Sequence, residues 1–256
     1  MQDYEKLNQS AWDEEVRRNN YWTRPADRES ISLARSGQLR LTLTPDGFMP
    51  ESWTRKIGTD VLALAAGGGQ QGPVLAASGR NVTVCDISQA QLEQDRKTAA
   101  AYGLDLRTVN TSMNDLTMLE DESFDTCINP VSLNFVSGLS PVFREVRRIL
   151  RPEGVFMFGI ANPVMYIFDV KALEKGKMKI RYTLPFSSCT SLSDREKRKM
   201  AEAKDTFEFS HTLGSVFSSL FSAGFVIEDA YTSPSTFEPV DSFIQDCYLA
   251  FLCVRS

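Results

Sequence analysis

Residues 61–72, Val61-Leu-Ala-Leu-Ala-Ala-Gly-Gly-Gly-Gln-Gln-Gly72, form the stretch of sequence that decides the fold. An apolar run ends in glycines and leads into a segment that favours a helix. Glycine permits a tight turn and lets a ligand approach the backbone closely, and the first amides of a helix lack partners within that helix. The stretch therefore predicts a buried strand over residues 60–64, a turn that meets a ligand, and a helix over residues 72–78.

Asp86 places an acid at the end of the next predicted strand, residues 81–86. It follows Gly67 by 19 residues (86 − 67), and a carboxylate at this point accepts hydrogen bonds from both hydroxyls of a ribose. Gly67, Gly69 and Gly72 complete the pattern G-x-G-x-x-G. The pattern indicates an adenosine-containing cofactor, which is either a nicotinamide or flavin dinucleotide or S-adenosylmethionine.

The chain after Asp86 alternates between helix and strand signals. Ser88 is a predicted helix cap, with Gln91 completing a capping box and Gly103 ending the helix. Further strands are predicted over residues 106–110, 124–128, 155–160, 225–231 and 247–254, with a turn at 152–154 and helices over 142–150 and 212–223. This order predicts an α/β fold with a mostly parallel sheet. The last connection is too short for a crossover helix, so the last strand is expected to be antiparallel.

Two segments fall outside this alternation. Residues 1–58 contain all three tryptophans and the turn signal Thr44-Pro-Asp-Gly47. We expect short helices and loops there, forming an N-terminal cap on a domain of residues 59–256. Residues 161–210 mix apolar, basic and serine-rich segments, and we expect an insertion that closes over a substrate.

Composition argues against several classes of function. The net charge of −5 disfavours a nucleic-acid partner, and no apolar run approaches the roughly 20 residues that span a bilayer. The five cysteines form no C-x-x-C pair, which is typical of buried free thiols in a reducing compartment. The single histidine, His211, has no nearby cysteine, so no metal site is expected. The polar N-terminus is not a signal peptide. We therefore expect a cytoplasmic protein with a small-molecule substrate and no membrane partner.

Several segments resemble those of class I S-adenosylmethionine-dependent methyltransferases. Asp121-Glu-Ser-Phe-Asp125 and Leu150-Arg-Pro-Glu-Gly154 resemble the D-x-S-F-D and L-K-P-G-G signatures of that family, whose fold also ends in a hairpin. The chain contains no Tyr-x-x-x-Lys, the base pair of short-chain dehydrogenases. From about residue 8 onward it is similar to a bacterial group with little-defined substrates, through residues 64–71, 91–95, 129–132, 162–164 and 209–213.

The resemblance implies a Rossmann-like fold with a seven-stranded sheet and roles for matching positions. The residues implied to contact the cofactor are Gln71 toward the methionine end, Ala65, Gly67 and Gly69 along the methionine and ribose, Asp86 on the ribose, and Ile87, Ser112 and Met113 around the adenine. Asn129 and Pro130 would face the cofactor and the path of methyl transfer. Ala63 and Ser112 stand where many class I enzymes carry an acid.

Methyl transfer needs a general base only when the acceptor atom carries a proton of high pKa. His211 is a candidate base, although a structural hydrogen bond is equally natural there. Asn129-Pro130 resembles the start of the Asn-Pro-Pro-Tyr motif of amino methyltransferases, with a turn that only shapes the pocket as the alternative. The candidates to wall the acceptor site, each with core packing as its alternative, are Tyr21, Trp22 and Tyr166, with Trp12, Met165 and Phe168.

Three functions follow from these observations. The first is a methyltransferase that uses S-adenosylmethionine on a small-molecule acceptor. The second is an NAD-dependent oxidoreductase, because the glycine pattern and Asp86 also suit a dinucleotide. The third is a catalytically silent S-adenosylmethionine-binding protein, prompted by Ala63 and Ser112.

Overall fold

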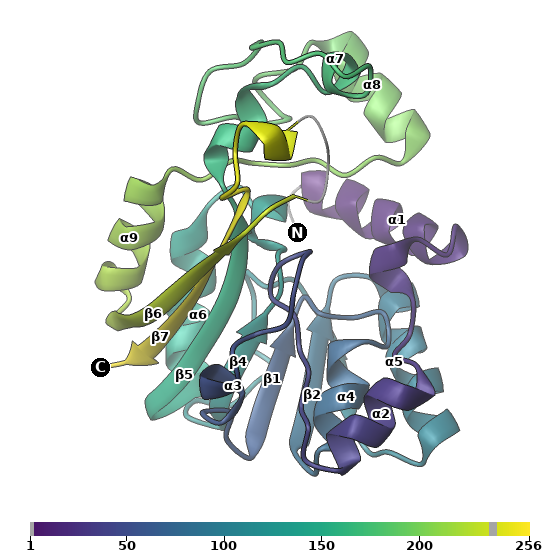
Figure 1. The fold of residues 1–256 in the computed structure, drawn as a ribbon, viewed down its shortest axis with the longest axis vertical. Coiled ribbons are helices and arrows are strands. Elements are labelled where there is room, and N and C mark those ends of the chain that lie inside the picture. The colour runs from purple at the N-terminus through teal and green to yellow at the C-terminus, as the bar shows by residue number, and fades with distance from the viewer. Residues whose placement is uncertain (1–2, 236–239) are drawn as a thin grey trace.

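The computed structural model describes residues 3–235 and 240–256, and its strands form a single sheet there (Figure 1). The order is β3-β2-β1-β4-β5-β7-β6. β7 runs antiparallel to both β5 and β6, and the remaining pairs are parallel. The predicted α/β fold with an antiparallel last strand is confirmed. The strands are β1 (Asp60–Leu64), β2 (Asn81–Asp86), β3 (Arg107–Asn110), β4 (Phe124–Asn129), β5 (Leu150–Ala161), β6 (Phe225–Ser233) and β7 (Tyr248–Arg255).

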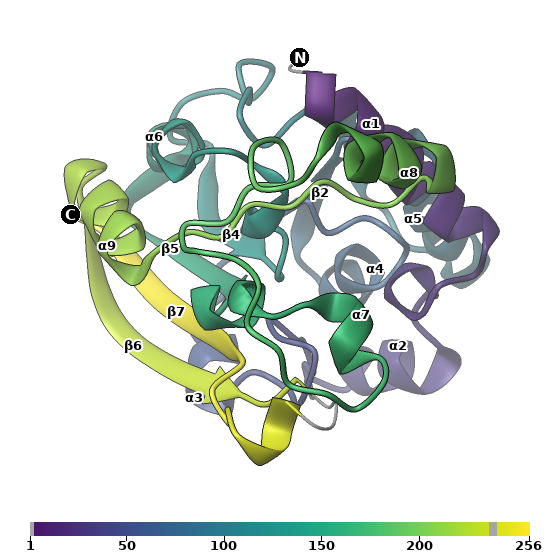
Figure 2. The same ribbon diagram turned by 90° about the horizontal axis from the view of Figure 1, so that it is seen from above.

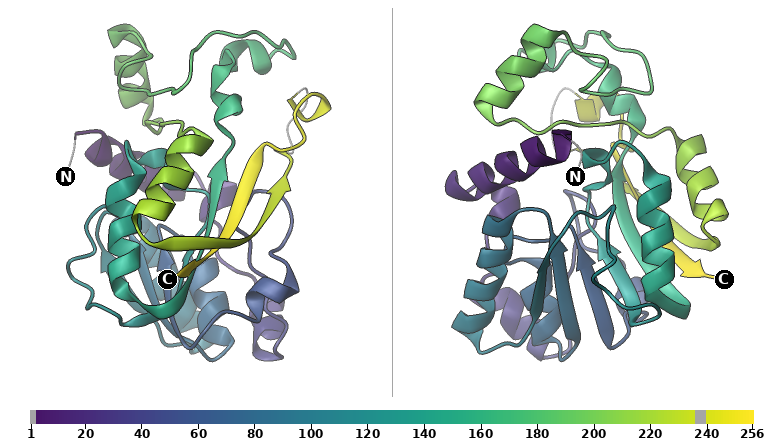
Figure 3. Two further views of the ribbon diagram at one scale, coloured as in Figure 1. Left: turned by 90° about the vertical axis from the view of Figure 1, so that its left-hand side faces the viewer. Right: turned by 180° about the vertical axis from the view of Figure 1, so that it is seen from behind.

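Helices cover both faces of this sheet (Figure 3). The α-helices are α1 (Asp3–Arg17), α2 (Arg28–Arg35), α3 (Glu51–Thr54), α4 (Gln71–Ala77), α5 (Gln89–Tyr102), α6 (Leu139–Ile149), α7 (Val170–Leu173), α8 (Asp194–Ala203) and α9 (Leu213–Ser222). Short 3-10 turns lie at η1 (Tyr21–Thr23), η2 (Leu133–Phe135), η3 (Pro163–Ile167) and η4 (Val240–Ser242).

Alternation along β1 shows how the core is divided. Leu62 and Leu64 belong to the cluster that contains α6 and α9, whereas Val61 and Ala63 belong to the cluster that contains α2, α3 and α4. Successive side chains of a strand point to opposite faces, and a parallel strand covered on both faces is apolar throughout. This is why β1 is recognisable in the sequence as an apolar run.

Two local predictions are wrong. The predicted turn at residues 152–154 lies inside β5, where Glu153 has a φ of 62° and the register with β4 shifts between Phe124 and Thr126. The capping box at α5 is only half formed. Ser88 Oγ accepts from the Gln91 amide at 3.1 Å, but the Ser88 amide donates to Asp86 Oδ1 at 2.9 Å instead of to a glutamine side chain.

The N-terminal segment spreads over several elements of the Rossmann-like domain. Its first two residues lie outside the described part of the chain. The helix α1 is longer than the short helices expected, and it packs on α5 near the carboxyl ends of the strands (Figures 1 and 3). The helix α2 packs on α4. The Leu43 carbonyl oxygen would lie 2.0 Å from a β-carbon at Gly159, so glycine lets residues 41–43 cross β5 closely.

Residues 161–210 lie beyond the same ends of the strands and carry η3, α7 and α8 (Figure 2). Backbone hydrogen bonds hold both ends of the segment to the rest of the chain. The Asn162 amide donates to the Cys247 carbonyl at 2.9 Å, and the Phe209 amide donates to the Asn134 carbonyl at 2.8 Å. Within the described ranges, no helix has both the length and the apolar character that a membrane span requires.

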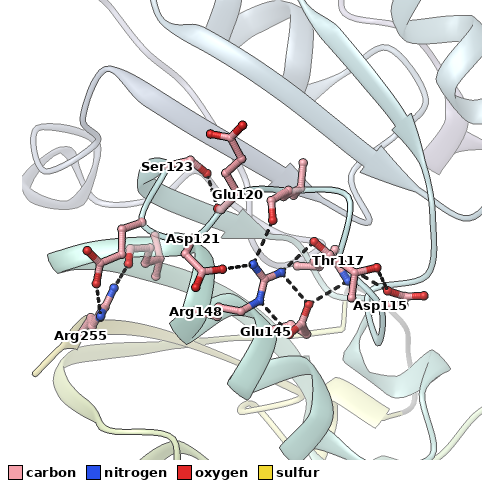
Figure 4. A network of polar contacts seen from close by, with 12 residues as sticks. Asp115, Thr117, Glu120, Asp121, Ser123, Glu145, Arg148 and Arg255 are labelled. Atoms are coloured by element: carbon pink, nitrogen blue, oxygen red, sulfur yellow. Dashed lines mark hydrogen bonds and ion pairs between the residues drawn. The ribbon is translucent and has the colours of Figure 1, made fainter.

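Arg148 on α6 anchors the segment that leads into β4 (Figure 4). Its guanidinium donates to the carbonyl oxygens of Leu116 and Leu119 and pairs with Glu145 and Asp121. Asp121 belongs to the D-x-S-F-D signature, so part of that signature has a structural role. The network fixes the chain that follows residues 111–113, which border the site described next.

Candidate active site

A cavity opens at the carboxyl ends of β1, β2 and β4, and we call it the first cavity. It contains about 1050 Å³ of space, including the part open to solvent. Ligands in open α/β sheets bind at this edge. Its lining comes from α1 (Glu5, Asn8, Trp12), from Trp22, from residues 42–45, 65–67, 70–71, 85–87 and Gln91, and from residues 111–113, 130–132 and 135–136.

Asp86 lies in the wall of the first cavity and is only 7% exposed. Its Oδ2 accepts from the Gly67 amide at 3.0 Å, and its Oδ1 accepts from the Ser88 amide at 2.9 Å. These bonds fix the carboxylate, and each oxygen keeps a further lone pair for a ligand hydroxyl. Burial raises the pKa of Asp86 to about 6, against the lowering effect of the two amides, and the charge of Asp13 raises it further.

The glycine loop is held by two buried acids. The Gly67 amide donates to Asp86, and the Gly68 amide donates to Asp95 Oδ2 at 3.0 Å. Burial raises the pKa of Asp95, with the amides of Gly69 and Gly68 opposing the rise. The N–H groups of Gly67 and Gly68 therefore bond within the protein, and neither is available to a ligand.

Gly67 is needed in the loop for a steric reason. A β-carbon there would lie 2.7 Å from Gln91 Cβ and 3.0 Å from Asp86 Oδ2. Ala65, which lines the first cavity, has a φ of 46°, an uncommon conformation for a residue other than glycine. Gly69 is not among the lining residues, and its carbonyl accepts from the Ala26 amide at 2.8 Å.

The acid that sequence reasoning missed near Ser112 is Glu5 of α1. Ser112 Oγ donates to Glu5 Oε1 at 2.7 Å, and Asn114 Nδ2 donates to the same oxygen at 3.0 Å. Glu5 is 5% exposed and lines the first cavity. A carboxylate thus stands beside Ser112 although position 112 itself carries none. Since 107 residues separate the pair, no local sequence signal connects them.

Asn129 and His211 do not line the first cavity. Asn129 Nδ2 donates to the Leu64 carbonyl and to Ser132 Oγ, each at 2.7 Å. His211 Nε2 lies 3.0 Å from the carbonyl oxygens of both Leu133 and Val136, and burial lowers the His211 pKa. These hydrogen bonds connect both side chains to the 130–136 turn and hold its backbone in place.

The predicted aromatic residues separate into two places. Trp12 and Trp22 line the first cavity, and Trp12 packs edge-on against Phe135 at 5.3 Å between ring centroids. Tyr21 is 62% exposed, lies outside the lining and packs edge-on against Trp22. Tyr166, Met165 and Phe168 line a second cavity, described below. The remaining predicted cofactor residues, Gln71, Ile87, Met113 and Pro130, all line the first cavity.

The first cavity fits an adenosyl cofactor. Asp86 offers two oxygens to a ribose. Gln91, which contacts the same glycine loop as Asp86, has a buried Oε1 that accepts no hydrogen bond from the described residues. Buried polar atoms of this kind are normally satisfied, so an orphaned acceptor in the lining indicates a missing donor. Ile87 and Met113 supply apolar contact for a base, and Glu5, Ser112 and Asn114 supply polar groups at its edge.

Comparison with known proteins decides which cofactor this is. A family model described as "Methyltransferase domain" matches residues 62–158. An uncharacterized methyltransferase of Bacillus subtilis is 37% identical over 243 residues, which cover 94% of this chain and 93% of that protein. The chain belongs to the class I S-adenosylmethionine-dependent methyltransferases. Its cofactor is S-adenosyl-L-methionine, and the comparisons give no support to the oxidoreductase alternative.

Further comparisons extend the similarity at lower sequence identity. A ubiquinone biosynthesis O-methyltransferase of Actinobacillus pleuropneumoniae is 29% identical over 109 residues, 41% of this chain and 47% of that one. The fold matches an S-adenosylmethionine-dependent methyltransferase of Mesorhizobium loti with a TM-score of 0.60 at 20% identity, covering 81% of this chain and 94% of that one. It also matches the 1,6-didemethyltoxoflavin-N1-methyltransferase of Burkholderia thailandensis with a TM-score of 0.62 at 15% identity, covering 99% and 89%.

Proposed function

We propose that this methyltransferase methylates a small organic molecule, and that the acceptor binds in the part of the first cavity walled by Trp12, Trp22, Phe135 and Val136. The observation that carries the proposal is the lining itself, in which two tryptophans, a phenylalanine and a valine face the same space as Asp86. Small-molecule sites combine an apolar wall with a few placed polar groups. Asp86 would hold the ribose, and the aromatic rings would exclude water from the acceptor.

The chain's own residues act mainly by positioning. When bound, S-adenosylmethionine supplies a methyl group on a sulfonium, which is already an activated leaving group. Among the residues that line the first cavity, the titratable side chains are Glu5, Cys85 and Asp86. Burial raises the pKa of Cys85 to about 12, so its thiol stays neutral. Alignment and exclusion of water are therefore the main contributions of the site, and alignment can supply about 7–11 kcal/mol in the best cases.

Asn129 and His211 act in this proposal as positioning residues. Asn129 ties the 130–132 turn to β1 through the Leu64 carbonyl, and His211 ties residues 133–136 to the end of the inserted segment. Pro130, Phe135 and Val136 thereby keep their places in the wall. The proposal replaces the expected catalytic role of both residues.

The test is transfer of an isotopically labelled methyl group to pools of small molecules sorted by acceptor atom (nitrogen, oxygen or sulfur). We expect label in one pool, and we expect Asp86→Asn to lose most of it. The control variant is Asp105→Asn, which changes an exposed carboxylate between α5 and β3. Label that enters only protein or nucleic acid would contradict the proposal. Binding of S-adenosylhomocysteine without transfer to any pool would favour the silent binding protein.

A further inference from the structure

A second cavity lies under the inserted segment, lined by η3, α7, α8, residues 181–192 and 205–208, and the start of β7. Among the described residues, none lines both the first and the second cavity. The chain at Phe207 and Glu208 lies between them. Asn8 of the first cavity donates to the Phe207 carbonyl at 3.0 Å, and Glu208 lines the second cavity.

Glu208 is one of the carboxylates that line the second cavity. Tyr166 Oη donates to Glu208 Oε2 at 2.6 Å, and Thr206 Oγ1 lies 3.4 Å from Oε1. The backbone is fixed as well, because the Ser188 amide donates to the Glu208 carbonyl at 2.8 Å and the Glu208 amide donates to Ser188 Oγ at 3.0 Å. The side chain is therefore held in one place by neutral hydrogen-bond donors.

The negative charge of Glu208 has no cationic partner in the described part of the chain. No ion pair within 4.0 Å involves it among the described residues. Burial raises the pKa of its carboxyl, and hydrogen bonds with Tyr166, Thr206 and Asn134 oppose the rise. Arg181 lines the same cavity but pairs with Glu196 and with Asp169. Glu208 is half-buried, and a carboxylate partly removed from water is stabilised by a cationic partner, so a cation that entered the cavity would find an uncompensated carboxylate.

Aromatic rings surround this carboxylate. Tyr166 stacks on Phe186 with 5.6 Å between centroids, and Tyr182 packs edge-on against Phe186 at 5.0 Å. Tyr248 lines the same cavity from β7. Burial, and next the charge of Glu208, raise the pKa of Tyr248 to about 12, so its ring stays neutral beside the acid. Aromatic faces attract cations, and more strongly where water is excluded.

The charged residues of the second cavity leave its lining acidic as a whole. Lys171, Lys199, Glu174 and Asp205 are exposed and balance one another at the rim. Arg181 is exposed as well and pairs with Asp169 and Glu196. Over the whole lining, three cations and five acids give a net charge of 3 − 5 = −2 with all groups ionised.

We propose that the second cavity binds a small organic cation, namely a protonated or quaternary amine that carries an apolar group. The cationic nitrogen lies against Glu208, and the apolar part lies against Tyr166, Phe186 and Tyr248. The proposal concerns binding and does not depend on whether the bound amine is itself the methyl acceptor.

Isothermal titration with benzyltrimethylammonium, benzyl alcohol and benzoate tests the proposal, because the three ligands share a ring and differ in charge. We expect the cation to bind at least about tenfold more tightly than the alcohol, with no measurable binding of benzoate. Glu208→Gln keeps an acceptor for Tyr166 and removes the charge, so the preference for the cation should disappear. Glu202→Gln, an exposed acid on α8, is the matched control and should leave the preference unchanged.

Two outcomes would overturn the proposal. One is equal affinity of the wild-type protein for the cation and the alcohol, or no binding of the cation. The other is a Glu208→Gln variant that keeps the preference. Binding of S-adenosylhomocysteine, measured in the same samples, shows that each protein is folded, because Glu208 does not line the first cavity. If Glu208→Gln does not fold, the comparison of the three ligands on the wild-type protein decides alone.

Discussion

Asp86 makes the affinity for S-adenosylhomocysteine depend on pH. The pKa of this acid is raised to about 6 by burial, and ribose hydroxyls that donate to it favour the ionised form. Affinity should therefore fall as the pH falls through 6. With this pKa about 97% of the carboxylate is ionised at pH 7.5 and about 9% at pH 5. If only the ionised form binds, the dissociation constant rises about tenfold between these pH values.

The stability of the unliganded protein should change in the opposite direction. The folded pKa of Asp86, about 6, lies above its ordinary value of 3.8. The folded protein thus binds this proton more tightly than the unfolded chain does. The stabilisation is complete below the ordinary pKa and is lost as the pH rises through about 6, by about 3 kcal/mol in total.

Asp86→Asn removes the charge, and because its Nδ2 cannot accept, one of the Gly67 and Ser88 amides also loses its acceptor. The amide has one acceptor oxygen and no charge, and hydrogen bonds to a charged group are worth about 1 kcal/mol more than neutral ones. For two hydroxyls this predicts roughly 30-fold weaker binding at pH 7.5, with no change between pH 7.5 and 5. The loss of stability with rising pH should also disappear.

Titration calorimetry at pH 5, 6 and 7.5 measures the affinities, and urea unfolding at the same pH values measures the stabilities. Quenching of tryptophan fluorescence offers a second readout, because Trp12 and Trp22 line the first cavity. Asp105→Asn should behave like the wild type. The reasoning is refuted if wild-type affinity does not change with pH, or if Asp86→Asn keeps the slope, which would assign it to another acid such as Asp95 or Glu5.

Three further predictions concern other parts of the structure. Glu5→Ala removes the acceptor of Ser112 and should weaken S-adenosylhomocysteine binding about tenfold in calorimetry; an unchanged affinity would exclude Glu5 from the site. His211→Phe leaves two carbonyl oxygens without a donor and should lower the free energy of unfolding in urea by about 1–3 kcal/mol, while the pH profile of methyl transfer stays as in the wild type; loss of the limb on the acid side of that profile would restore His211 as a base. Arg148→Met should lower the free energy of unfolding by about 2–4 kcal/mol. Arg144→Met changes an exposed arginine and should lower it by less than about 0.5 kcal/mol; equal losses would refute the role of the Arg148 network.

The sequence predicted those features that depend on neighbouring residues. The bounds of β1 and β2 were predicted as observed, because β1 is an apolar run that leads into glycines and β2 is rich in β-branched residues and ends at an acid. The Ser88 cap and the Gly103 end of α5 were also predicted, since both depend on local backbone geometry. Asp86 is the last residue of β2. It lies in the first cavity because the carboxyl ends of neighbouring parallel strands lie at the same edge of the sheet.

The sequence could not predict contacts between distant segments. The Glu5 side chain reaches Ser112, and Asn8 reaches Phe207 across 199 positions, through packing that no periodic pattern encodes. Residues 152–154 carry the usual signals of a turn and still extend β5. Proline and glycine are accepted there because β7 begins to pair with β5 only at Val155, so no bond to that neighbour is lost.

The position of α1 affects how this enzyme should be compared with its relatives. The family match covers residues 62–158, yet Glu5, Asn8 and Trp12 line the same space as the matched motifs. An expression clone that started at β1 would keep each strand of the sheet and would lose that side of the binding chamber. Differences in selectivity among homologues should therefore be sought upstream of the shared motifs, in the leading helix.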